Sequence, residues 1–356
     1  MTRICILPEK EYDHWNNFVA SHPDGWLTHL SQWSEILSGS VGNFQLFITA
    51  IIDKKTGEIK AGMPIYLKKT LFSGRKMIGA PLATFFDPLV SGVAELRLLL
   101  QAAKNCLDKL GAKYLRIKIF KTEQLFLQAG YKLKSDYVTH ILSLDDDLDS
   151  IFRRFDRTCV RKNIRKAEKS NLKTTIISDK DELKNFYFLY SRARKRLGLP
   201  ALPIKFFEEI FNSFVPSGKA IYLVTRYGNI PVASLLIFIY KNRCSAEALG
   251  WDINFKSLRP VSFIYWEAIK ISRTLGCKYF DFGRTARDNK DLIFFKSNWG
   301  TQVSNLSELV ILKSNSQSTL TRKMIRLKKF GNHIFSFLPD AAYHHASNLF
   351  YKLFAE

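Results

Sequence analysis

The stretch Leu275-Gly-Cys-Lys-Tyr-Phe280 repeats a stretch found 165 residues earlier, Leu110-Gly-Ala-Lys-Tyr-Leu115. Each copy follows a run of apolar residues with helical spacing, at residues 94–110 and 261–275. Further upstream, Gly57-Glu-Ile and Gly228-Asn-Ile each precede an apolar run, 171 residues apart. Two matches in the same order and at similar offsets indicate an internal repeat.

Each half of the repeat predicts the order strand, turn, strand, helix, strand. Gly57 and Gly228 are expected at hairpin turns, where glycine tolerates a positive φ. Gly111 and Gly276 are expected just past the end of a helix. A strand joined through a helix to the next strand favours a right-handed parallel pair. The predicted fold class is therefore α/β (α+β), with mixed sheets flanked by helices.

Composition bounds the class of protein. The chain has 356 residues, of which 46% are hydrophobic, which is enough for two domains of ordinary size. The five cysteines are widely spread without a CxxC pair, and the seven histidines form no ligand spacing, so we expect reduced thiols and no metal site. The N-terminal residues predict no signal peptide, and no apolar run is long enough to span a membrane. We expect a cytoplasmic protein, either soluble or peripheral at the inner face of the membrane.

The positive charge is distributed unevenly. The net charge is +22, of which residues 1–150 carry +2 and residues 151–356 carry +20. The segment 153–169 alone has eight basic residues and two acids, and its spacing predicts one amphipathic helix with a cationic ridge. A basic surface without a ligand is one interpretation. The asymmetry favours the other, a polyanionic partner such as a pyrophosphate-linked substrate, tRNA or an anionic membrane.

The candidate chemistry lies between Asp281 and Gly300. Asp281 directly follows an apolar strand, and the carboxyl ends of strands in α/β sheets are common ligand sites. Arg284 and Arg287 carry guanidinium groups suited to phosphate or carboxylate. Lys296 stands among aromatic residues that could lower its pKa or hold it as a fixed cation. The structural alternatives are an Asp281–Arg284 pair and a Lys296 that lies along the surface with its amine in water.

The whole chain resembles the FemAB-like branch of the GNAT superfamily, including relatives associated with exopolysaccharide clusters. The matching residues in the second half are Arg157-Thr-Cys-Val-Arg161-Lys162-Asn-Ile-Arg165-Lys166-Ala167, Phe186-Tyr187, Leu197-Gly198-Leu-Pro200, Asp281-Phe-Gly-Arg284 and Phe295-Lys296-Ser-Asn-Trp299-Gly300. Those in the first half are Thr28-His29, Trp33 and Asp87-Pro88.

The resemblance implies tandem GNAT-like domains, which we place at residues 1–150 and 151–313, followed by a basic amphipathic tail at 314–356. It also implies transfer of an acyl or aminoacyl group to an amine or hydroxyl of a peptidoglycan or exopolysaccharide precursor. By resemblance, the lysine that handles the donor or the transition state is Lys296. The phosphate-binding residue is Arg161, with Arg157 and Arg165 as neighbours. We assign Lys296, Asp281 and Arg284 as catalytic, and Arg157, Arg161, Arg165, Arg287 and Trp299 as substrate-binding.

The donor stays open. GNAT enzymes that use coenzyme A hold its pyrophosphate on a glycine-rich turn, whose backbone N–H groups point at the anion. The corresponding segment here, Phe255 to Ser262, has no glycine, and Pro260 has no N–H. The long helical insertion of some tRNA-dependent relatives is also absent from residues 199–260. We therefore expect no resident cofactor, with aminoacyl-tRNA or acyl-CoA as the donor.

Other classes of function remain open. One is a CoA-dependent GNAT N-acyltransferase, and another is a non-catalytic RNA- or membrane-binding protein on the same fold. The tail has basic residues at 322–329 and apolar residues beyond, which fits either a helix packed on the second domain or an interfacial anchor.

Overall fold

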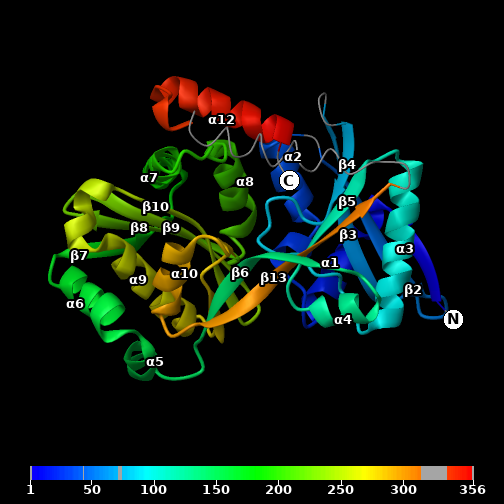
Figure 1. The fold of residues 1–356 in the computed structure, drawn as a ribbon, viewed down its shortest axis with the longest axis horizontal. Coiled ribbons are helices and arrows are strands. Elements are labelled where there is room, and N and C mark those ends of the chain that lie inside the picture. The colour runs from blue at the N-terminus through cyan, green and yellow to red at the C-terminus, as the bar shows by residue number, and fades with distance from the viewer. Residues whose placement is uncertain (1, 43, 71–73, 314–334, 355–356) are drawn as a thin grey trace. The chain divides into compact units, whose positions relative to one another are not determined.

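The computed structural model describes residues 2–42, 44–70, 74–313 and 335–354 (Figure 1). The chain forms two compact units. Of the described residues, the first unit takes 2–137, 305–313 and 350–354, and the second takes 138–304 and 335–349. The domain limits proposed from the sequence, at residues 150 and 313, stay a prediction.

The first unit is a mixed sheet in the order β1-β2-β3-β4-β5-β13. Neighbouring strands are antiparallel, except for the parallel pair β4 and β5. The strands are β1 (Thr2–Leu7), β2 (Phe44–Asp53), β3 (Ile59–Thr70), β4 (Gly74–Ile78), β5 (Tyr114–Ile119) and β13 (Gln302–Leu312). The helices are α1 (Tyr12–Ser21), α2 (Gln32–Ser40), α3 (Val93–Lys109) and α4 (Glu123–Gln128), with 3-10 turns at Glu9–Glu11 and Leu27–His29.

Helix α3 makes the crossover between the parallel strands and covers the core of the first unit. Leu96, Leu99, Ala103 and Leu107 fall on one helical face and are fully buried. They pack with apolar side chains of β3, β4 and β5 in a single cluster. Each of the three leucines contributes roughly 1.5–3 kcal/mol when it leaves water, so this face fixes the helix on the sheet.

The second unit is a mixed sheet in the order β6-β11-β10-β9-β8-β7. Strands β10 and β11 run parallel, and the other neighbours are antiparallel. The strands are β6 (Lys134–Ser143), β7 (Leu172–Ile176), β8 (Ala220–Tyr227), β9 (Ile230–Tyr240), β10 (Arg243–Trp251), β11 (Tyr279–Asp281) and β12 (Thr285–Ala286). The helices are α5 (Leu148–Arg154), a π-helical turn (Arg157–Arg161), α6 (Lys162–Glu168), α7 (Leu183–Arg196), α8 (Ile204–Phe214), α9 (Pro260–Thr274), α10 (Lys290–Ser297) and α12 (Asp340–Phe354), with 3-10 turns at Lys180–Glu182 and Ile253–Leu258.

Helices cover both faces of this sheet. Helix α7 packs on β9 and β10 from one side, and α9 packs on β8 and β9 from the other, with α6 against it (Figure 1). Gly250 of β10 lets α7 approach closely, because a Cβ there would lie 2.3 Å from the backbone nitrogen of Tyr190. Only glycine fits where two backbones come this near.

The predicted fold class is confirmed, and the repeat is visible in the element order. The strands β2, β3, β4 and β5 with α3 correspond to β8, β9, β10 and β11 with α9. Gly57 and Gly228 lie at positive φ between hairpin strands, as predicted. Gly111 and Gly276, which follow α3 and α9, also have positive φ. The two helices predicted within the repeat, 94–110 and 261–275, differ from α3 and α9 by a single residue at each end.

The prediction of a single helix over the basic segment 153–169 is wrong. The chain is extended at Phe155 (φ −69°, ψ 145°), so α5 ends there and a new helical segment begins. Asp156 caps that segment by accepting from the backbone nitrogens of Thr158 (2.8 Å) and Cys159 (2.6 Å). Phe155 is buried against Trp266 and Trp299, which holds the break in place.

Part of the predicted C-terminal tail can be placed. The basic residues at 322–329 lie outside the described residues. Beyond them, α12 packs on the second unit, where the Tyr343 hydroxyl donates to the carbonyl of Leu199 (2.8 Å) and the Ser347 hydroxyl accepts from the backbone nitrogen of Ala201 (3.3 Å). Among the helices in the described ranges, none is both long enough and apolar enough to cross a lipid bilayer.

A buried carboxylate organises one loop of the first unit. Asp87 is only 2% exposed. Its Oδ1 accepts from the backbone nitrogens of Phe120 (3.1 Å), Lys121 (3.0 Å) and Thr122 (3.0 Å), and from the Thr122 hydroxyl (2.7 Å). The carbonyl of the same residue lies 2.7 Å from Nε2 of the buried His29. Asp87 and His29, two of the residues behind the family resemblance, thus have structural partners within the first unit.

The substitution Asp87→Ala is expected to destabilise the protein by about 3 kcal/mol or more, because it leaves three backbone N–H groups without an acceptor. Asp87→Asn keeps an acceptor oxygen and should cost less. Urea unfolding followed by circular dichroism measures both. Asp108→Ala, at an exposed site on α3, is the control and should change the free energy of unfolding by less than about 0.5 kcal/mol. Equal stability of Asp87→Ala and the control would contradict this account.

Candidate active site

The candidate site begins where the parallel strands of the second unit part. Strands β10 and β11 pair only from Arg243–Tyr279 to Ser245–Asp281, and β11 then ends while β10 continues to Trp251. The chain turns at Gly283, whose φ is +75° and where a Cβ would lie 2.8 Å from the carbonyl oxygen of Ala246. Both constraints require glycine. This turn follows the carboxyl end of β11, the position at which the sequence predicted a ligand site.

Asp281 is fully buried and accepts three hydrogen bonds. Its Oδ1 accepts from the Thr139 hydroxyl and from the backbone nitrogen of Gly283 (2.8 Å), and its Oδ2 accepts from the guanidinium of Arg243. The ion pair with Arg243 is nearly water-free, since that side chain is 11% exposed. The structural partner of Asp281 shown here is Arg243, whereas the sequence suggested Arg284. Because both carboxylate oxygens accept hydrogen bonds from the protein, Asp281 is suited to holding Thr139, Arg243 and Gly283 in position.

Lys296 is a buried cation beside this carboxylate. It is 4% exposed on α10, so it is not the surface lysine of the structural alternative. Its Nζ donates to the carbonyls of Phe282 (2.6 Å) and Gly283 (2.7 Å). Burial lowers the pKa of Lys296 to about 8, and the nearby charge of Asp281 partly opposes this shift. At pH 7 the group is still protonated, as a fixed positive charge.

Sequence reasoning missed a polar group of this cluster, His140 on β6. It is fully buried, and neither ring nitrogen has a hydrogen-bond partner among the described residues. Burial and the charge of Lys296 lower the pKa of His140 to about 4, so the imidazole is neutral at pH 7. The hydroxyls of Ser245 and Thr285 are likewise buried without a partner among the described residues. Native proteins rarely leave such groups unpaired, so this cluster has unused hydrogen-bonding capacity.

The other predicted residues of this region lie in different surroundings. Arg284 is half-buried and Arg287 is exposed, both in the segment between β11 and α10. Trp299 is fully buried against Phe155 and Phe282, with ring centroids 5.0 and 5.5 Å away. Trp299 therefore packs in the core of the second unit. Its contact with substrate stays a prediction.

The basic segment forms a second feature, which we call the cationic groove. This hollow has a volume of about 510 Å³. Its lining has five cations and no acid: Arg157, Thr158, Lys162, Arg165, Lys166, Lys169 and Ser170. Two of the predicted substrate-binding residues, Arg157 and Arg165, therefore lie together. Arg161 is outside the lining and half-buried, with no hydrogen-bond partner for its Nε among the described residues.

The groove segment is joined to the end of α10. The backbone nitrogen of Asp156 donates to the carbonyl of Asn298 (2.7 Å). Gly300, at φ +66°, lies against Arg154, where a Cβ would come within 3.0 Å of the Arg154 carbonyl oxygen. The Phe-Lys-Ser-Asn-Trp-Gly motif thus links the buried Lys296 to the start of the cationic groove.

The turn before α9 does not fit a coenzyme A cradle. It is a 3-10 turn that ends at Arg259, a non-glycine residue with φ +59°, and Pro260 opens the helix. Proline removes one of the N–H groups that a pyrophosphate would use. Among the described residues there is also no cluster of three or more His, Cys, Asp or Glu side chains that could hold a metal ion.

Comparison with known proteins agrees with this fold. Residues 154–291 match the family model described as acetyltransferase (GNAT) domain, so the second unit carries a GNAT domain. The crystal structure of FemX has a TM-score of 0.70 at 19% identity, covering 91% of this chain and 99% of that one. Residues 154–291 thus carry a GNAT domain, and the likeness to FemX shows the same fold along nearly the whole chain, as the FemAB-like resemblance implies.

Two further structures share the fold. A tandem GNAT protein from the clavulanic acid biosynthesis pathway has a TM-score of 0.56 at 10% identity, covering 89% of this chain and 100% of that one. L-PGS from Bacillus licheniformis has a TM-score of 0.54 at 14% identity, covering 85% and 96%. No curated protein matches the chain by sequence.

The lowered pKa of Lys296 should be visible in the pH dependence of the free energy of unfolding. Its pKa is about 8 in the folded chain and near 10.5 when unfolded, so between these values the unfolded chain binds more protons. The free energy of unfolding should therefore rise with pH over this window, by at most roughly 3 kcal/mol from this residue. Urea unfolding of wild type and Lys296→Met from pH 7 to 10.5 measures the difference. Parallel curves would contradict the lowered pKa.

Proposed function

We propose that the protein transfers an acyl or aminoacyl group to an amine or hydroxyl of a phosphate-bearing cell-envelope precursor, of peptidoglycan or exopolysaccharide. The observation that carries the proposal is the cationic groove within the GNAT domain, joined to the motif that holds Lys296. Five cations without an acid favour a ligand with several phosphate charges. The envelope precursor as acceptor comes from the family resemblance.

The chemistry needs positioning and positive charge. The acceptor nucleophile attacks the donor carbonyl, a tetrahedral oxyanion forms, and its collapse expels the leaving group. An ammonium has three N–H donors, and Lys296 gives two to the carbonyls of Phe282 and Gly283. The third is the donor that we assign to the developing oxyanion. Arg284 adds positive charge in the same segment.

The proton of the nucleophile requires an acceptor. Asp281 already accepts from Thr139, Arg243 and Gly283, so its role is to hold the strand end and Lys296 in place. His140 is neutral at pH 7 and has acceptor capacity that no described residue uses. We assign His140 as the group through which this proton leaves.

An aminoacyl donor fits better than acyl-CoA. The segment before α9 lacks the glycines and the N–H of residue 260 that a CoA pyrophosphate would need. The fold is shared with L-PGS and with a domain of a putative lysylphosphatidylglycerol synthetase from Agrobacterium fabrum, named for an aminoacylated phospholipid. Aminoacyl-tRNA is therefore the first donor to test, and a CoA-dependent N-acyltransferase is the competing activity.

Replacing Lys296 should slow transfer strongly while leaving the fold intact. We expect Lys296→Met to lower the rate by about 10²–10³-fold, the usual loss of an oxyanion donor. Mass spectrometry of envelope glycans and lipids from cells with wild type, with the variant and without the protein gives the mass of the transferred group. Lys290→Met, an exposed lysine of the same helix, is the control. Wild-type products from Lys296→Met would remove the proposal, provided near-UV circular dichroism shows an unchanged fold.

Neutralising the groove should weaken binding of phosphorylated ligands. The triple variant K162Q/K166Q/K169Q is expected to lose about tenfold or more in affinity for geranyl pyrophosphate and to show a smaller salt dependence. The control K104Q/K109Q/K132Q removes the same charge from exposed sites of the first unit. Equal losses in both variants would reject the groove as the binding site. Strong, salt-sensitive tRNA binding without turnover would favour the non-catalytic RNA-binding alternative.

A further inference from the structure

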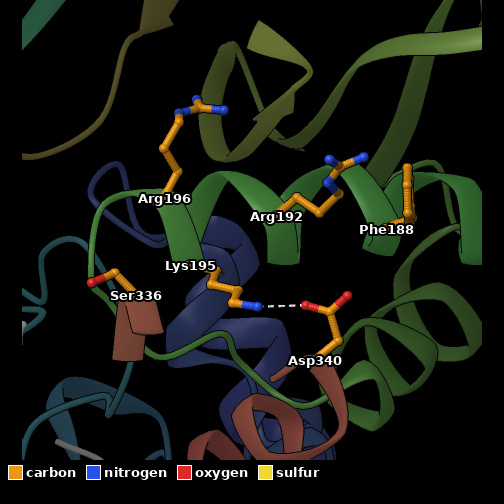
Figure 2. Close-up of a pocket in the computed structure, with 6 residues that line it drawn as sticks. All are labelled: Phe188, Arg192, Lys195, Arg196, Ser336 and Asp340. Carbon is orange, nitrogen blue, oxygen red and sulfur yellow. Dashed lines mark hydrogen bonds and ion pairs between the residues drawn. The ribbon is translucent and has the colours of Figure 1, made fainter. Parts of the chain in front are cut away.

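A second cationic pocket lies at the end of α7. Its volume is about 490 Å³, within the range of small-molecule sites. Six side chains line it: Phe188, Arg192, Lys195, Arg196, Ser336 and Asp340 (Figure 2). Four of them come from α7, and Ser336 and Asp340 come from the C-terminal region. It shares no residue with the cationic groove and none with the cluster around Lys296.

Aromatic rings lie close to all three cations, with Nζ of Lys195 5.8 Å from the ring of Tyr343. The guanidinium of Arg196 stacks on Trp251 at 4.8 Å and donates to the Trp251 carbonyl (3.3 Å). The guanidinium of Arg192 lies 5.1 Å from the ring of Phe188, which is 49% exposed. Fixed guanidinium groups lose little entropy when they bind an anion.

The positive charge of the pocket is only partly balanced. Lys195 and Arg196 follow Arg192 by three and four residues on one helix, a spacing at which like charges repel. Asp252 lies 4.0 Å from Arg192. Asp340 is the acid of the lining, and its carboxylate accepts from Lys195 at 2.6 Å (Figure 2). Three cations against Asp252 and Asp340 leave a net positive charge of one, which favours an anionic ligand.

Asp340 therefore stands where an external anion would bind. Its side chain is 82% exposed, so the Lys195–Asp340 pair is largely solvated and contributes little to stability. Helix α12, whose first residue is Asp340, is held by Tyr343 at Leu199, so the helix can stay docked when the pair opens. An anionic ligand can therefore displace Asp340 and bind Lys195, and breaking the Lys195–Asp340 pair costs little free energy.

We propose that this pocket binds the phosphate group of a phosphate monoester, whose organic part lies on Phe188, and that Asp340 competes with that phosphate for Lys195. Helix α12 thereby tunes the affinity of the pocket. The proposal is independent of the transfer chemistry, because none of the six lining residues takes part in it.

The test uses phenyl phosphate and inorganic phosphate as probes of the full chain at low ionic strength. The K162Q/K166Q/K169Q variant serves as the background, so that the cationic groove does not dominate the signal. Isothermal titration calorimetry should show that Asp340→Asn tightens binding about fivefold, because a competing charge near the surface is removed. Lys195→Gln should weaken binding by a similar factor. Phe188→Ala should weaken phenyl phosphate and leave inorganic phosphate unchanged.

The control for net charge is Asp108→Asn, an exposed acid of α3. It raises the net charge by the same amount and should not change the affinity. The proposal is overturned if Asp340→Asn binds no more tightly than Asp108→Asn, or if Lys195→Gln binds as the background does. Circular dichroism of each variant separates loss of binding from loss of fold, and Asp340→Asn, as a gain of affinity, cannot be explained by unfolding.

Discussion

The carboxylate of Asp281 is the interaction on which the candidate active site depends. A fully buried charge is tolerated only when it is paired and hydrogen-bonded. Here the donors come from β6 through Thr139, from β10 through Arg243 and from the turn after β11 through Gly283. One side chain thus fixes three segments of the chain at the point where the parallel strands part.

The position of Lys296 follows from that of Asp281. The ammonium group binds the carbonyls of Phe282 and Gly283, the two residues directly after Asp281. The turn at Gly283, which has a positive φ and lies against β10, presents these carbonyls to Lys296. The buried cation is therefore held by backbone geometry that the Asp281 carboxylate stabilises, which keeps it in one place during a reaction.

The fold was predictable because its signals are local. Gly57 and Gly228 at hairpin turns, and Gly111 and Gly276 after helices, mark element ends within a few residues, and all four lie at positive φ. The break between α5 and α6 was missed because it depends on tertiary packing. Nothing near Phe155 in the sequence reveals that its ring is buried between Trp266 and Trp299.

The site was only partly predictable for the same reason. Asp281 and Lys296 stand in one recognisable stretch, whereas Thr139 lies 142 residues from Asp281 along the chain, and Arg243 lies 38 residues away. No local pattern marks them or His140. Arg161, expected beside Arg157 and Arg165, lies outside the cationic groove that those two residues line. The turn from Arg157 to Arg161 is π-helical, and its wider spacing takes the two side chains off the common face that an α-helix would give them.

The groups that this chain offers to an anion are side-chain cations, whereas a glycine-rich turn offers backbone N–H groups. In a glycine-rich turn, backbone N–H groups at fixed positions bind a pyrophosphate of fixed geometry. Here Arg259 occupies a left-handed conformation that is costly for a non-glycine residue, and Pro260 removes a donor. The cationic groove offers long, exposed Arg and Lys side chains instead. Such side chains can bind anions of varied shape, and their binding depends strongly on salt concentration. This kind of surface suits a nucleic acid backbone or a lipid-linked diphosphate better than a single small cofactor.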